Sequence, residues 1–117
     1  MTEVENVLRE ARALVENGWC QGRFSCRYWP VGDYREHLDM PLVVRHVAPG
    51  NERQQCYCLT GAVASVTSSV DVLEEAVGSL QKHAKYWGYS LADWNDKSDR
   101  THEEVLALFD AAMGDLS

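Results

Sequence analysis

The first eighteen residues alternate apolar and polar positions with the period of an amphipathic helix. Apolar side chains recur three and four positions apart along this stretch, at Val4, Val7, Leu8, Ala11 and Val15. Thr2 and Glu5 have the spacing of a capping box, and Gly18 is a typical helix stop. The pattern therefore predicts a helix over residues 2–17 that buries one face in the core.

Three later segments show the same helical period. Residues 57–67 place small side chains on one face, which lets another backbone approach closely, and residues 70–87 carry an apolar stripe. Residues 102–113 carry a third stripe and follow a second capping box, formed by Thr101 and Glu104. These segments predict three more helices.

Residues 23–55 lose the helical period. Residues 41–47 form a short β-branched run, and turn-forming residues lie at 29–33 and 48–51. We expect a loop-rich insert that carries a small β-hairpin. The predicted fold is therefore mainly α: a compact four-helix single domain over residues 1–117, with the insert at residues 23–55.

Composition narrows the classes of protein. The chain has 117 residues, 45% of them hydrophobic, which is enough for one ordinary core. Its net charge is −7 and its lysines and arginines are scattered, so it lacks the basic stripe that nucleic-acid binding needs. No apolar run is long enough to cross a membrane, and we expect a cytoplasmic protein whose four cysteines are thiols.

The loop before the last predicted helix, WNDKSDR, has two interpretations. In the structural one, the loop acids complement the helix N-terminus, Asn95 closes a turn and Trp94 covers the core. In the functional one, Trp94 offers a stacking face and Arg100 an exposed fork for a carboxylate or phosphate. Residue types alone favour the structural interpretation without excluding the other.

The cysteines and histidines invite two further hypotheses. Gln21 and Cys26, followed by His83 and Asn95, match the chain order of a papain-like protease, but the glutamine lies one residue too close and the chain is too short for that fold. A zinc site would take its ligands from among six residues: Cys20, Cys26, Cys56, Cys58, His37 and His46. The paired spacing of zinc ribbons and fingers is missing. We expect no catalytic residue, no metal and no cofactor.

Three short motifs carry a resemblance to a known family. They are WCQG at residues 19–22, CLTGA at 58–62 and WNDKSDRTHEEV at 94–105. Together they resemble an uncharacterised family of short actinobacterial and actinophage proteins with the patterns W-x-Q-G, C-x-x-G-A and W-N-D-x-x-x-R-T-x-x-E-V. The insert from residue 23 to 55 looks longer than in typical relatives. The resemblance implies a shared fold but no known activity, and it directs attention to the motif residues.

These observations lead to one expected function and one alternative. We expect a non-enzymatic binding protein, phage-like and host-directed, that captures a host protein or a small anionic, nucleotide-like ligand as a monomer or homodimer. The predicted ligand-binding residues are Trp19, Gln21, Trp94, Asn95, Asp96 and Arg100. The alternative is a small hydrolase that uses a cysteine or the Asn95 and Asp96 loop. Should Arg100→Ala unfold the protein, Arg100 would be a buried partner of the loop acids, and the site is to be sought in the insert around Tyr28, Trp29, Tyr34 and His37.

Overall fold

The mainly α fold is confirmed by the computed structural model, which describes residues 2–21, 25–27, 43–48, 55–84, 91–97 and 99–116. Its helices are α1 (Glu3–Asn17), α2 (Leu59–Val66), α3 (Val70–Ala84), α4 (Leu91–Asn95) and α5 (His102–Leu116). Four of them match the predicted segments. The fifth, α4, is a five-residue helix that contains Trp94 and Asn95, where the sequence suggested a loop.

Both predicted capping boxes contribute to helix starts. Thr2 Oγ1 accepts a hydrogen bond of 3.1 Å from the Glu5 N–H at the start of α1. At α5 the box is reciprocal: Thr101 Oγ1 accepts from the Glu104 N–H at 3.1 Å, and Glu104 Oε1 accepts from the Thr101 N–H at 2.9 Å. Each box satisfies backbone donors that a helix N-terminus otherwise leaves unpaired.

The described strands form a four-stranded mixed sheet rather than a hairpin confined to the insert. They are β1 (Gly18–Gln21), β2 (Ser25–Arg27), β3 (Val43–Val47) and β4 (Gln55–Tyr57), in the order β2-β4-β1-β3. β1 pairs antiparallel with β3 and parallel with β4, and β2 pairs antiparallel with β4. The predicted insert at residues 23–55 therefore contributes β2 and β3 to the sheet, and β4 begins at its last residue. The turn predicted at residues 29–33 and the helix end predicted at residue 87 lie outside the described residues.

The β-branched run predicted at residues 41–47 contains β3, but the rest of the sheet was not predicted, because its strands are short and β1, one of its two inner strands, does not alternate. All four residues of β1 are buried, so the period of two that marks a half-exposed strand is absent. The last residue of β4, Tyr57, is the first residue of the helix predicted over residues 57–67. Tyr57 belongs to β4 and Cys58 is the N-cap of α2, so the helix starts at Leu59.

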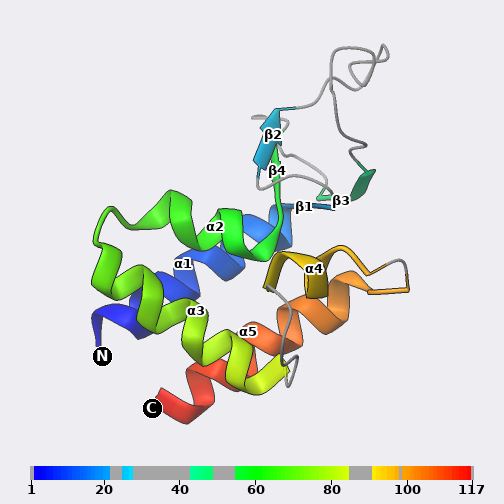
Figure 1. Ribbon diagram of the computed structural model, residues 1–117. Coiled ribbons are helices and arrows are strands. Elements are labelled where there is room, and N and C mark those ends of the chain that lie inside the picture. Colours follow the sequence, from blue (N-terminus) through cyan, green and yellow to red (C-terminus); the bar gives the residue numbers. More distant parts are fainter. Residues whose placement is uncertain are drawn as a thin grey trace.

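The core lies between α1, α2, α3 and α5, with the sheet at one end of this helical body and both termini away from it (Figure 1). The largest fully buried side chains include Leu8, Leu59, Leu80, Phe109 and Trp19. Trp19 belongs to β1 rather than to a helix. The core therefore continues from the helices into the sheet, and α4 packs against both α2 and α3 at this end.

Candidate functional site

The predicted site residues come from three elements that meet at the sheet end of the core. Trp19 and Gln21 lie on β1, Trp94 and Asn95 on α4, and Arg100 just before α5. β1 follows α1 without an intervening loop, because Gly18 is both the C-cap of α1 and the first residue of the strand. This junction fixes where Trp19 and Gln21 lie relative to α1.

Asn95 is the centre of the cluster and is fully buried, at 0% exposure. Its Oδ1 accepts hydrogen bonds from Trp19 Nε1 at 2.8 Å and from the Leu59 N–H at 3.2 Å. Its Nδ2 donates to the Cys20 carbonyl at 3.1 Å and to Asp96 Oδ1 at 2.9 Å. The two donors and two acceptors around it fix the orientation of the amide, and all four of its hydrogen-bonding positions are used. One side chain thereby joins β1, α2 and the end of α4.

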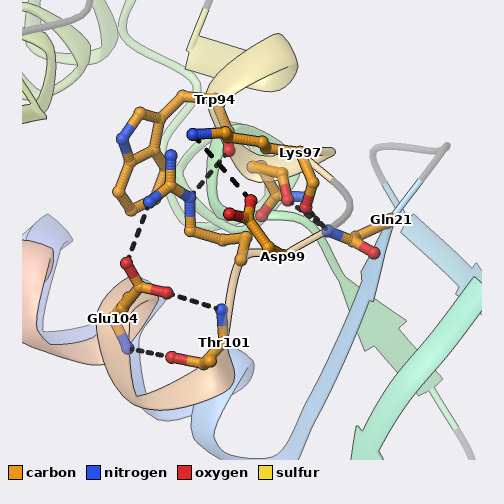
Figure 2. A network of polar contacts seen from close by, with 8 residues as sticks. Gln21, Trp94, Lys97, Asp99, Thr101 and Glu104 are labelled. Atoms are coloured by element: carbon orange, nitrogen blue, oxygen red, sulfur yellow. Dashed lines mark hydrogen bonds and ion pairs between the residues drawn. The ribbon is translucent and has the colours of Figure 1, made fainter.

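Gln21 secures the chain just after α4. Its Nε2 donates to the Asn95 carbonyl at 2.7 Å and to the Lys97 carbonyl at 2.9 Å. Figure 2 shows the Gln21 amide reaching these carbonyls from the strand. Both donors of the amide are therefore used to hold the backbone, whereas its Oε1 has no hydrogen-bond partner among the described residues.

Trp19 extends the network to the start of α5. Its indole is 1% exposed and stacks on the His102 ring, with centroids 5.9 Å apart and planes at 24°. His102 Nε2 lies 2.9 Å from the Val15 carbonyl. Because a carbonyl only accepts hydrogen bonds, Nε2 carries the proton in this contact. The N-terminus of α5 is thus tied to the C-terminal part of α1.

Arg100 is largely structural, which corrects the expectation of an exposed fork. Its side chain is 11% exposed and lies over the Trp94 ring, with Cζ 3.7 Å from the ring centroid. Nε donates to the Trp94 carbonyl at 3.0 Å, and Nη1 pairs with Glu104 Oε2 at 3.0 Å (Figure 2). Within the described residues, only Nη2 of this guanidinium lacks a hydrogen-bond partner.

The acids of the loop are more exposed than the amides. Asp96 is exposed and accepts from Asn95 Nδ2, and Asp99 lies 3.9 Å from Lys97 Nζ in an exposed pair. The pKa of Glu104 lies below its ordinary value, first because the Thr101 backbone N–H bonds its carboxylate and then because of the Thr101 and Arg100 side chains. These carboxylates border the cluster but lie outside its buried centre.

The described cysteines are buried and out of reach of a substrate in solution. Cys58 caps α2, its Sγ accepting from the Gly61 N–H at 3.3 Å. Burial raises the pKa of Cys58 to about 11, so it remains a thiol at neutral pH. Cys20 and Cys56 are both 0% exposed. No set of three possible metal ligands gathers among the described residues, and the side chains of Cys26, His37 and His46 lie outside them.

The structure brings all six predicted site residues into one cluster, but it uses most of their polar groups internally. Trp19 and Asn95 are sealed in the core, while Gln21 and Trp94 are buried with only small exposed edges. Sequence reasoning missed the Leu59 N–H and the ring of His102. The spacing of the three motifs was the available signal, because each motif contributes at least one partner to the Asn95 and Arg100 contacts. Tyr28, Trp29, Tyr34 and His37 lie outside the described residues.

Fold and cluster together define a mainly α protein in which a buried polar network joins a small mixed sheet to the last helix. The chain belongs to a family of unknown function (DUF6197), whose model matches residues 1–115. No curated protein and no solved structure matches it. Across the described residues, no helix is long and apolar enough to cross a membrane.

The contacts of Arg100 predict a measurable loss of stability in Arg100→Ala. The substitution removes two hydrogen bonds and the stack on Trp94, so we expect the free energy of unfolding to fall by about 1–3 kcal/mol in urea denaturation. Arg12→Ala is the matched control, because Arg12 pairs with Glu16 and Asp110 in a more exposed setting. That variant should lose less than about 1 kcal/mol. Equal losses in the two variants would contradict the structural role of Arg100.

Proposed function

We propose that the protein is a non-enzymatic binding protein and that the loop between α4 and α5 presents Arg100 to an anionic group of its partner. The observation that supports this is the guanidinium itself. Trp94 and Glu104 hold its plane in place, while Nη2 keeps an uncommitted donor within the described part of the chain. A pre-oriented guanidinium loses little conformational freedom on binding, which favours recognition of a carboxylate or phosphate.

The charges around Arg100 do not attract anions in general, so the proposed contact is confined to Arg100 and its immediate neighbours. Lys97 is exposed nearby, but Asp96, Asp99 and Glu104 are negative and the whole chain carries a charge of −7. A broad attractive field for anions is therefore lacking, and selectivity depends on hydrogen-bond geometry at Arg100. Gln21 Oε1 is a second polar atom left available by the described network, and we assign it to accept a donor from the same partner.

The alternative of a small hydrolase has less support. Asn95 has no unused hydrogen-bonding position, and the Cys58 thiol is protonated and engaged at the start of α2. A nucleophile needs an adjacent base and a reachable position. Within the described residues, no cysteine meets these requirements, so binding without chemistry is the function we propose.

The partner we propose is a host protein with an acidic segment or a small anionic, nucleotide-like ligand. The host-directed and phage-like parts of this proposal, and the cytoplasmic location, rest on the sequence resemblance and on composition. In either case the shared chemistry is a carboxylate or phosphate that accepts from Arg100 Nη2. The protein would present this contact as a monomer or homodimer.

Isothermal titration with ATP and AMP, together with affinity capture from host lysate, tests the proposal. Arg100→Lys keeps the charge but loses the planar fork, and we expect it to weaken binding by roughly 10-fold or more. Arg12→Lys is the control, because it makes the same substitution on α1, away from the proposed contact, and should leave binding unchanged. Binding that is equally strong in wild type and Arg100→Lys would overturn the assignment to Arg100. Turnover of ATP by the purified protein would instead favour the enzyme alternative.

A further inference from the structure

Two cysteines occupy paired backbone positions in the register of the sheet. In the antiparallel pair of β2 and β4, Cys26 is the Cα partner of Cys56, flanked by the pairs of Ser25 with Tyr57 and Arg27 with Gln55. Residues opposite each other on antiparallel strands have Cα atoms about 4.5–5.5 Å apart and project to the same face of the sheet. A disulfide spans Cα distances of about 4.4–6.8 Å. The backbone register therefore satisfies the first requirement for a crosslink.

The other cysteines are placed differently. Cys20 has Val44 as its Cα partner on β3, and Cys58 lies beyond β4 as the N-cap of α2, where its sulfur is engaged by the Gly61 N–H. Crosslinking Cys58 would withdraw this cap and disturb the start of a buried helix. Of the four cysteines, only Cys26 and Cys56 are direct register partners in the described strands.

From this juxtaposition we propose that Cys26 and Cys56 form a reversible disulfide, a redox site that locks β2 to β4 when the protein meets a disulfide oxidant. Cys56 is an unoxidised, fully buried thiol in the structure, which represents the reduced state. β2 and β4 share three residue pairs, and the cysteines form the middle one. A covalent bond there strengthens a pairing that is otherwise short enough to open locally.

The oxidation balances as two successive thiol–disulfide exchanges with oxidised glutathione. Because Cys56 is fully buried, we assign the first exchange to Cys26, whose thiolate attacks one glutathione sulfur and expels the other as a thiolate. The Cys56 sulfur, having lost its proton, then attacks the Cys26 sulfur and releases the second glutathione. Two cysteine thiols are oxidised, one glutathione disulfide is reduced, and the two protons pass to the released thiolates.

The crosslink would close the insert into a covalent loop. The bond joins positions about 30 residues apart, and closing a loop of that length restricts the unfolded chain. It would also bring the two ends of the insert together in the sheet next to β1, which carries Trp19 and Gln21. Oxidation is therefore expected to raise the melting temperature by several degrees without altering the helical core.

Peptide mapping of the full chain after treatment with oxidised glutathione tests the proposal. Unreduced trypsin digestion should join residues 24–27, which contain Cys26, to residues 54–82, which contain both Cys56 and Cys58. The intact mass should fall by about 2 Da, and dithiothreitol should reverse both changes. The link should persist in Cys58→Ser and Cys20→Ser and disappear in Cys26→Ser.

Three outcomes would overturn it: no loss of mass under the oxidant, a loss of about 2 Da that persists in Cys26→Ser, or a link lost in Cys58→Ser while that variant remains folded by circular dichroism. In the wild-type chain, a second digestion with chymotrypsin, which cleaves after Tyr57, separates Cys56 from Cys58, so the test stays decisive even if a variant fails to fold. Binding at Arg100 does not enter this experiment, so the two proposals can fail independently.

Discussion

Asn95→Ala is expected to lower the free energy of unfolding by about 3–5 kcal/mol, because it removes hydrogen bonds from several buried groups. The indole N–H of Trp19, the Leu59 N–H and the Cys20 carbonyl would all lose the hydrogen bond that Asn95 provides. Each unsatisfied group costs about 1–3 kcal/mol, although such losses do not add fully. Urea denaturation measures the effect.

Asn6→Ala is the matched control for this experiment. Asn6 is exposed on α1, where its side chain accepts one long hydrogen bond of 3.4 Å from Arg9. Its replacement should change stability by less than about 0.5 kcal/mol. A similarly small change for Asn95→Ala would mean that water replaces the missing amide and that the hydrogen bonds of Asn95 contribute little to stability.

Asn95→Asp separates hydrogen bonding from packing, because it keeps the shape of the side chain. The retained oxygen still accepts from Trp19 and Leu59, but the second oxygen faces the Cys20 carbonyl and Asp96 Oδ1, which are both acceptors. We expect this variant to be at least as unstable as Asn95→Ala at pH 7. Lowering the pH should reduce the difference in the free energy of unfolding between this variant and wild type, since a protonated carboxyl can donate again.

Trp19→Ala is the second substitution with a large expected effect. The indole is almost fully buried, contacts His102 and donates to Asn95, so its removal should cost about 3–5 kcal/mol. Trp19→Phe retains most of the apolar area but loses the N–H donor, and we expect it to cost about 1–2 kcal/mol. Thermal unfolding of both variants partitions the effect between ring burial and the hydrogen bond.

A double-mutant cycle extends this experiment. In Trp19→Phe combined with Asn95→Ala, the two losses should be less than additive, because both variants remove the same hydrogen bond. Additive losses would contradict direct coupling between the two side chains. If Trp19→Phe proves as costly as Trp19→Ala, the donor rather than the buried ring dominates the contribution of Trp19.

The helices were predictable from sequence because local signals specify them. Thr2 with Glu5 and Thr101 with Glu104 mark helix starts within four residues of chain, and the apolar stripes identify the buried faces. The sheet was not predictable in the same way. Trp19 pairs with Tyr57, far away along the chain, and a uniformly buried strand such as β1 has no alternation to detect.

The sequence singled out residues that do cluster, but it misjudged how they use their polar groups. Residue types singled out Gln21, Asn95 and Arg100, because amides and a guanidinium are difficult to explain by packing alone. Their hydrogen-bond partners are mostly backbone carbonyls and N–H groups, which carry no residue-specific signal. The sequence therefore indicated that a polar cluster exists without showing that its members are largely used by one another.

The direct junction between α1 and β1 has a consequence for changes in chain length. A helix rotates successive side chains by about 100° and a strand alternates them by 180°. Because α1 passes directly into β1 at Gly18, the end of the helix determines the direction in which each side chain of the strand points. An insertion of one residue there would turn Trp19 and Gln21 away from Asn95 while leaving the composition almost unchanged. The segment around residues 17–19 is thus a place where length, more than residue identity, determines whether the two halves of the chain fit together.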